Sequence, residues 1–146
     1  MSIKMRLFAS ETYLAANGTP QEIEDIAGHR LISLSPSSPQ VSAGAAMVQH
    51  ILTYDIPSLL TVNNYFGVLQ SVLNDLGIGV LPDYVTEDFP ALVRVLPDFE
   101  SGDIPVYLAY PEELRQSKRI MVFRDFVQEE IIAHRRRMKE TGAAPA

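Results

Sequence analysis

The chain has 146 residues, of which 47% are hydrophobic and 21% charged, so it is long enough for one ordinary domain with its own core. Its 18 acidic and 12 basic residues give a formal net charge of −6, which disfavours binding to nucleic-acid phosphates. The sequence has no cysteine, which excludes disulfides and thiolate metal sites, and it shows no signal peptide and no apolar run of membrane-spanning length. We therefore expect a cytoplasmic protein with no membrane partner.

In chain order, the first element is a strand over residues 3–9, where apolar residues alternate with Lys4 and Arg6. Ser10 is expected to cap a short helix, and Asn17-Gly18 to supply its left-handed stop. A helical turn over Glu22–Ile26 and a strand over Arg30–Leu34 follow, and then a loop rich in serine and proline over Ser35–Gly44. The stretch Ala45–Tyr54 is ambiguous, and we expect it to be extended towards its end. Asp55–Pro57 is expected to be a turn.

The clearest helix begins at Asn63-Asn64, directly after a strand over Ser58–Val62, and extends to about Asp75 because apolar residues recur at helical spacing. Gly77 is expected to stop this helix. A buried strand over Ile78–Leu81 comes next, and then a turn or short helix over Asp83–Asp88, a strand over Leu92–Leu96 and a loop over Pro97–Gly102. The strand over Ile104–Tyr110 is apolar enough to be buried on both faces, and Ser117–Lys139 is one long helix. This alternation predicts an α/β fold with a mainly parallel sheet.

The junction between the strand and the clearest helix carries the polar residues of greatest interest, Asn63 and Asn64, with Thr61 just before them. A helix N-terminus has unpaired N–H groups and a positive dipole end, so it favours a carboxylate, sulfate or phosphate. In open α/β sheets, ligands bind beyond the carboxyl ends of strands, which is this location. Gly79 and Val80, in the next strand, are expected to line the same cleft. The alternative is that Asn63 only caps its helix.

Other chemistries find little support. The three histidines, His29, His50 and His134, lack the spacing of metal ligands, and the acidic pairs Glu112-Glu113 and Glu129-Glu130 point apart on a helix. A basic run, residues 135–137, suits the negative end of the last helix better than nucleic acid. Since no nucleophile elbow, phosphate loop or dinucleotide motif is present, we predict no catalytic residue, no metal and no cofactor.

Three blocks of sequence carry recognisable motifs. They consist of Phe8–Leu14 with Gly18–Pro20 and Asp25–His29, then Val62–Asn64 with Asp75–Pro82, and then Leu92–Pro97 with Pro105–Pro111, Ser117–Arg119 and Phe123–Val127. In order and spacing these blocks resemble the effector-binding domain of LysR-type transcription regulators. Glu11 stands where that family usually has proline, and residues 35–49 lack the family's usual tryptophan.

The resemblance implies a two-lobed fold like that of type II periplasmic binding proteins, with a small effector, often a carboxylate, between the lobes. By this comparison, residues 1–140 form a partial effector-binding domain. Residues 9–103 are the complete second lobe, residues 104–139 are the strand and long helix that return to the first lobe, and residues 141–146 are a disordered tail. DNA would be bound through a helix-turn-helix domain that precedes Met1, and the regulator would be a homo-oligomer. The alternatives are a solute-binding lobe for transport and an enzyme on the same two-lobed fold.

If most of the first lobe is absent, the strand over 104–110 and the apolar stripe of the last helix lose their usual covering. We therefore expect the chain to bury them against another copy of itself, or to rearrange the helix. We also expect weak or no effector binding, because half of the cleft is missing.

Overall fold

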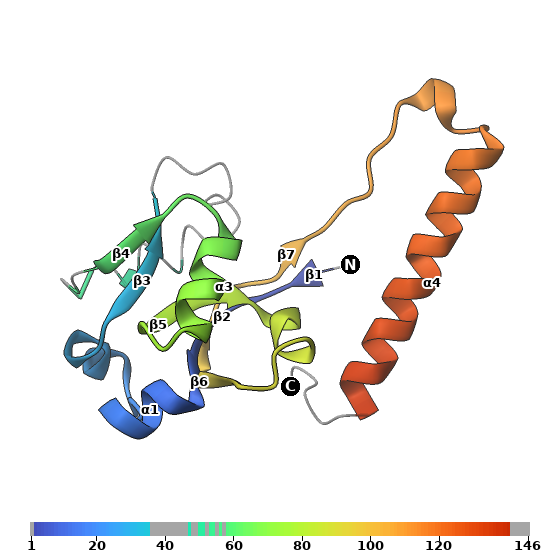
Figure 1. Cartoon of the computed structure of the whole chain (residues 1–146). Helices are drawn as coiled ribbons and strands as arrows, with labels where there is room; N and C mark the ends of the chain where they lie inside the picture. The colour runs from blue at the N-terminus through green and yellow to red at the C-terminus, as the bar shows by residue number, and fades with distance from the viewer. Residues whose placement is uncertain are drawn as a thin grey trace. The chain divides into compact units, whose positions relative to one another are not determined.

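The computed structural model in Figure 1 describes residues 2–35, 47, 50–51, 53–54, 56 and 58–140. The chain divides into two compact units, one formed by Ser2–Ile104 and the other containing the chain from Pro105 onward. Most of the predicted loop at Ser35–Gly44, and the predicted tail at 141–146, lie outside the described residues.

The first unit is built on a five-stranded sheet with the order β4-β3-β5-β2-β6. The strand β2 is antiparallel to both of its neighbours, so the other four strands all run in one direction. The predicted mainly parallel α/β fold is therefore confirmed. The strands are β2 Met5–Ser10, β3 Leu31–Leu34, β4 Ser58–Val62, β5 Ile78–Pro82 and β6 Leu92–Glu100; a separate two-stranded sheet pairs β1 Ser2–Ile3 with β7 Ile104–Pro105.

Side chains alternate across the sheet and form a hydrophobic cluster on each face. The helix α1, Glu11–Asn17, and the 3₁₀ helix η1, Ile23–Gly28, cover one face, and Tyr13 and Ile26 are buried there. The helix α3, Tyr65–Leu73, and the 3₁₀ helix η2, Asp83–Glu87, cover the other face. Because β2 is buried along its whole length between these two layers, it is the central element of the core.

Local signals place the ends of the first helix as predicted. The Ser10 hydroxyl accepts a hydrogen bond from Tyr13 N at 3.1 Å, and Gly18 has a φ of +85°.

The end of α3 differs from the prediction, because the helix stops at Leu73 and the left-handed residue is Asp75, with a φ of +58°. A Cβ added at Gly77 would lie 2.1 Å from the Arg30 carbonyl oxygen, so Gly77 permits a close backbone approach and is not the helix stop.

The prediction of an extended stretch towards Tyr54 is wrong for the residues that are described there. Met47, His50 and Ile51 are helical, and Thr53 and Tyr54 form a turn. Met47 and Ile51 are four positions apart in the sequence, and both are buried in the cluster that α1 covers. This spacing of buried residues is typical of a helix and was not recognised in the ambiguous pattern.

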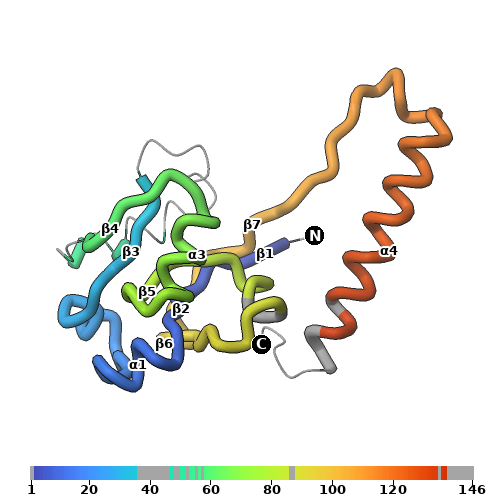
Figure 2. Tube along the Cα trace, viewed as in Figure 1, coloured from blue at the N-terminus to red at the C-terminus, as the bar shows by residue number. Residues whose placement is uncertain are grey.

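The strand β6 is longer than predicted, because the expected loop at 97–102 continues the strand to Glu100. The strand, labelled in Figure 2, pairs with β2 in a register that jumps from Leu7 opposite Val95 to Arg6 opposite Glu100. The intervening residues 96–99 thus have no partner on β2 and form an extended bulge, in which Leu96 has a φ of +50°. A proline and a left-handed residue made this segment look like a loop in the sequence.

The second unit contains a short 3₁₀ helix, η3 Glu112–Leu114, and one long helix, α4 Lys118–Glu140. The prediction of a strand buried on both faces at 104–110 is wrong, since only Ile104–Pro105 is strand and Tyr107 is 82% exposed. Among the described strands, none pairs with residues 106–110. From Pro105 onward no described side chain is fully buried, so this unit has no core of its own.

Candidate functional site

The carboxyl ends of β3, β4 and β5 lie at one edge of the sheet because these strands are parallel. Backbone hydrogen bonds close this edge: Ser35 N donates to Val62 O at 2.7 Å, and Asp83 N donates to Lys4 O at 2.9 Å. The segment Asn63-Asn64 leaves the edge from β4 and leads directly into α3. The fold therefore brings the predicted helix tip to the edge where ligands of open α/β sheets bind.

Asn64 is the residue that caps α3. Its side-chain oxygen accepts a hydrogen bond from Gly67 N at 2.8 Å, and its amide nitrogen donates to the Asn63 side-chain oxygen at 2.6 Å. Asn63 is exposed and Asn64 half-buried, so the capping role considered for Asn63 belongs to Asn64. A Cβ at position 67 would lie 3.1 Å from Val62 Cβ, a tight contact that glycine avoids. Gly67 was not among the predicted site residues, although it lies in the first turn, where the helix passes close to β4.

Thr61 lies on the exposed part of β4, beside two serines. Ser33 Oγ is 2.8 Å from Ser58 Oγ, and the Thr61 hydroxyl is 3.4 Å and 3.5 Å from these two oxygens, respectively. The three hydroxyls therefore form a small polar cluster across the parallel pair of β3 and β4.

Gly79 and Val80 lie in the buried strand β5. A Cβ added at Gly79 would lie 2.6 Å from Val68 Cγ1 and 2.8 Å from Val72 Cγ2, so the absence of a side chain allows α3 to pack against the sheet. Val80 points to the opposite face and belongs to the cluster that α1 and η1 cover. Both residues thus have packing roles, and contact with a ligand stays a prediction for them.

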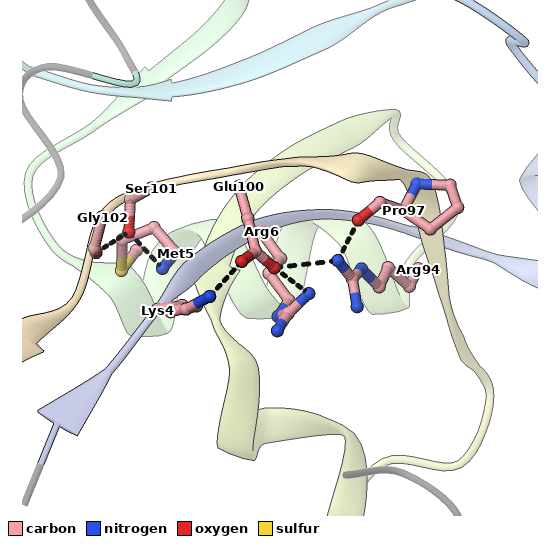
Figure 3. Close-up of polar contacts among 8 residues, drawn as sticks. All are labelled: Lys4, Met5, Arg6, Arg94, Pro97, Glu100, Ser101 and Gly102. Carbon is pink, nitrogen blue, oxygen red and sulfur yellow. Dashed lines mark hydrogen bonds and ion pairs between the residues drawn. The ribbon is translucent and has the colours of Figure 1, made fainter. Parts of the chain in front are cut away.

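The structure also shows a charged cluster that the sequence analysis missed (Figure 3). Glu100 forms ion pairs with Lys4, with Arg6 and with Arg94, the last at 3.0 Å. Arg94 also donates to the carbonyl oxygen of Pro97, in the bulge of β6. The Arg6 side chain is only 4% exposed, so its pairing with Glu100 offsets the cost of burying a charge. Two basic residues on one face of an otherwise apolar strand were the available signal.

This charged cluster lies on β2 and β6, three to four strands away from β4. With strands about 4.8 Å apart, β2 and β6 lie roughly 14–19 Å from β4, the strand that ends just before Asn63. Since the charges of this cluster pair with one another, we treat it as part of the sheet's structure.

The histidines do not come together. His29 Nδ1 is 3.2 Å from the Tyr13 hydroxyl, whereas the His50 ring stacks on Phe99 with a centroid distance of 5.5 Å. Among the residues that the structure describes, no three histidine, cysteine or carboxylate side chains lie close enough to hold a metal ion. Within the same residues, no helix has the length and apolar character needed to span a bilayer.

Comparison with known proteins identifies the family. Residues 1–131 match the LysR substrate binding domain. The chain belongs to this family. A relative in Escherichia coli, the uncharacterized HTH-type transcriptional regulator YhjC, is 30% identical over 120 residues, which cover 79% of this chain and 40% of that protein. The chain spans between 37% and 45% of the length of the curated LysR-type relatives that it matches.

Solved structures agree with this assignment. The regulatory domain of CrgA, a LysR-type transcriptional regulator from Neisseria meningitidis, matches with a TM-score of 0.72 and 26% identity, over 89% of this chain and 65% of that one. The substrate binding domain of a putative molybdenum ABC transporter from Clostridium difficile matches with a TM-score of 0.52 and 13% identity, over 70% of this chain and 47% of that one. The second likeness shows the fold alone, and together they confirm a fold of the periplasmic-binding-protein kind.

Proposed function

We propose that this chain is the effector-sensing part of a LysR-type transcription regulator, which binds a small anionic metabolite and catalyses no reaction. The family match over residues 1–131 supports this proposal, as do relatives that are transcriptional regulators. In this proposal residues 9–103 form one lobe and residues 104–139 contribute to the other. DNA is bound through a separate helix-turn-helix domain, and the regulator acts in the cytoplasm as a homo-oligomer.

The observation that carries the anionic effector is the position of the α3 tip. It lies at the carboxyl edge of the parallel strands, and the exposed Asn63 stands beside the cap at Asn64. The positive end of the helix dipole and the N–H groups of the first turn favour a carboxylate there. We infer that Asn63 and Asn64 are the first polar contacts, and that Thr61, Gly79 and Val80 are secondary ones.

The sharpest test changes the charge of the tip without removing the cap. Aspartate caps helices as well as asparagine does, so Asn64→Asp keeps α3 stable while it places a negative charge where the effector would bind. Acetate and sulfate are titrated into the 146-residue chain, and the amide shifts of Tyr65 and Phe66 are followed by NMR. We expect these shifts in the parent chain and not in Asn64→Asp.

Asn74→Asp is the matched control, because Asn74 caps the opposite end of the same helix. It adds the same charge about 15 Å away along the axis, so the shifts at Tyr65 should persist. Equal anion responses in Asn64→Asp and in the parent chain would contradict the proposed site. Shifts centred on Lys4 and Arg94 would move the anion to the charged cluster.

A further inference from the structure

A second binding feature lies on the face of the sheet that α3 covers. A cavity of about 260 Å³ opens between the first turn of α3 and η2, within the first unit. Four aromatic side chains line it, Tyr65 and Phe66 from α3 and Tyr84 and Phe89 from η2 and the turn after it. The cavity shares the first turn of α3 with the effector site proposed above, but it is lined by side chains that lie over Leu69 and Leu81, whereas that site consists of Asn63, Asn64 and backbone N–H groups.

Two of the rings, Phe66 and Tyr84, are exposed, and the other two, Tyr65 and Phe89, are half-buried. Phe66 is 69% exposed and Tyr84 is 42% exposed, whereas the floor is formed by Leu69 and Leu81, which are buried. Burial, and to a smaller extent the neighbouring Tyr84, raises the pKa of the Tyr65 hydroxyl, so this ring is neutral at physiological pH. Large aromatic side chains that remain exposed around a cavity are typical of a binding site.

The charged group in the lining is a carboxylate. Asp88 is exposed, lines the cavity, and forms no ion pair with any residue that the structure describes. A carboxylate beside aromatic rings disfavours an anion, and an apolar ligand would partly desolvate it without a compensating partner. The net charge of −6 adds a long-range attraction for cations.

We propose that this cavity binds a small organic ammonium ion, with the aromatic rings around the cationic group and Asp88 supplying the opposite charge. Aromatic faces attract cations through their quadrupole, and quaternary ammonium groups are recognised in this way because they are poorly hydrated and bulky. A volume of about 260 Å³ is slightly below the roughly 300–1,000 Å³ that is usual for ligand pockets, which suits a ligand of the size of choline.

The test uses choline and its neutral tert-butyl analogue, which has the same shape with carbon in place of the charged nitrogen. Both are titrated into the 146-residue chain by calorimetry, and the ring protons of Tyr84 and Phe66 are followed by NMR. We expect choline to bind in the millimolar range or better and the neutral analogue at least about tenfold more weakly. Equal binding of the two would overturn the proposal, as would no detectable binding of choline.

Two variants locate the ligand. Tyr84→Ala removes an exposed ring and should weaken choline binding roughly threefold to thirtyfold, and Asp88→Asn should weaken it about twofold to fivefold. Asp98→Asn is the matched control, because Asp98 is an exposed carboxylate on β6 outside the cavity, and its affinity should equal that of the parent chain. Affinities unchanged in both Tyr84→Ala and Asp88→Asn would place choline elsewhere and refute the site. Because both residues are exposed, neither change should prevent folding, which the thermal midpoint of each variant verifies.

Discussion

Gly79 provides a quantitative test of how α3 packs on the sheet. Carbon atoms in contact are normally about 3.5–4.0 Å apart, so the distances of 2.6 and 2.8 Å from an added Cβ to Val68 and Val72 require α3 to move away from β5. Such overpacking costs about 1–3 kcal/mol, and the stiffer unfolded chain returns about 0.4–1 kcal/mol of this. We therefore expect Gly79→Ala to destabilise the chain by about 1–2 kcal/mol.

Thermal unfolding followed by circular dichroism measures this effect, and for a unit of this size each kcal/mol lowers the midpoint by about 4–8 °C. Gly102→Ala is the control, since no atom lies within 4 Å of its added Cβ, and it should leave the midpoint unchanged or slightly higher. Adding Val68→Ala to Gly79→Ala should cost less than the sum of the two single changes, because it removes the nearest clash. A Gly79→Ala midpoint equal to that of Gly102→Ala would refute the packing argument.

Four further predictions follow from the described contacts. Asn64→Ala should cost about 1 kcal/mol in urea unfolding, while Asn64→Asp, which keeps the capping oxygen and loses only the exposed hydrogen bond to Asn63, should cost clearly less; equal losses would disprove the cap. Glu100→Gln leaves Arg6 buried without its carboxylate and should cost about 2–4 kcal/mol by the same measurement, whereas Lys4→Met, at a half-exposed position, should cost about 1 kcal/mol or less. The exposed apolar face of α4, which includes Phe126 at 58% exposure, should make the chain self-associate in light scattering, and Phe126→Glu should reduce this; a clean monomer of the parent chain at high concentration would contradict the expectation. The pKa of Tyr65 is raised in the fold, so the stability that its neutral hydroxyl contributes is complete below the unfolded pKa of about 10 and is lost as the pH rises through the higher folded pKa. Tyr65→Phe should therefore flatten the loss of stability at alkaline pH. Tyr107→Phe, at an exposed position, should not.

Features set by local chemistry were predicted well. The Ser10 cap, the Gly18 stop and the start of α3 depend on residues within one turn of each other, so the sequence pattern contains their cause. The mainly parallel sheet also followed, since alternating strands and helices leave few other arrangements. For the same reason the sequence pattern predicts that the polar tip at Asn63 lies at the sheet edge.

Features set by distant contacts were not predicted. Lys4 and Glu100 are 96 positions apart, and nothing local in either segment indicates that they pair. The role of Gly79 depends on Val68 and Val72 from another element, and the same glycine in the sequence is equally compatible with ligand contact. The strand at 104–110 was predicted from apolar composition alone, although a strand needs a neighbour with which to form hydrogen bonds.

The bulge in β6 has a consequence for insertions and deletions. Four residues, 96–99, lie between the last regular pair, Leu7 with Val95, and the pair of Arg6 with Glu100. The length of this segment, and not only its composition, decides which β6 side chain arrives opposite the buried guanidinium. A deletion of one residue there either shortens the bulge or, if the bulge keeps its length, brings Ser101 into that place and shifts the carboxylate out of it. In the second case the buried guanidinium of Arg6 would need another residue to neutralise its charge.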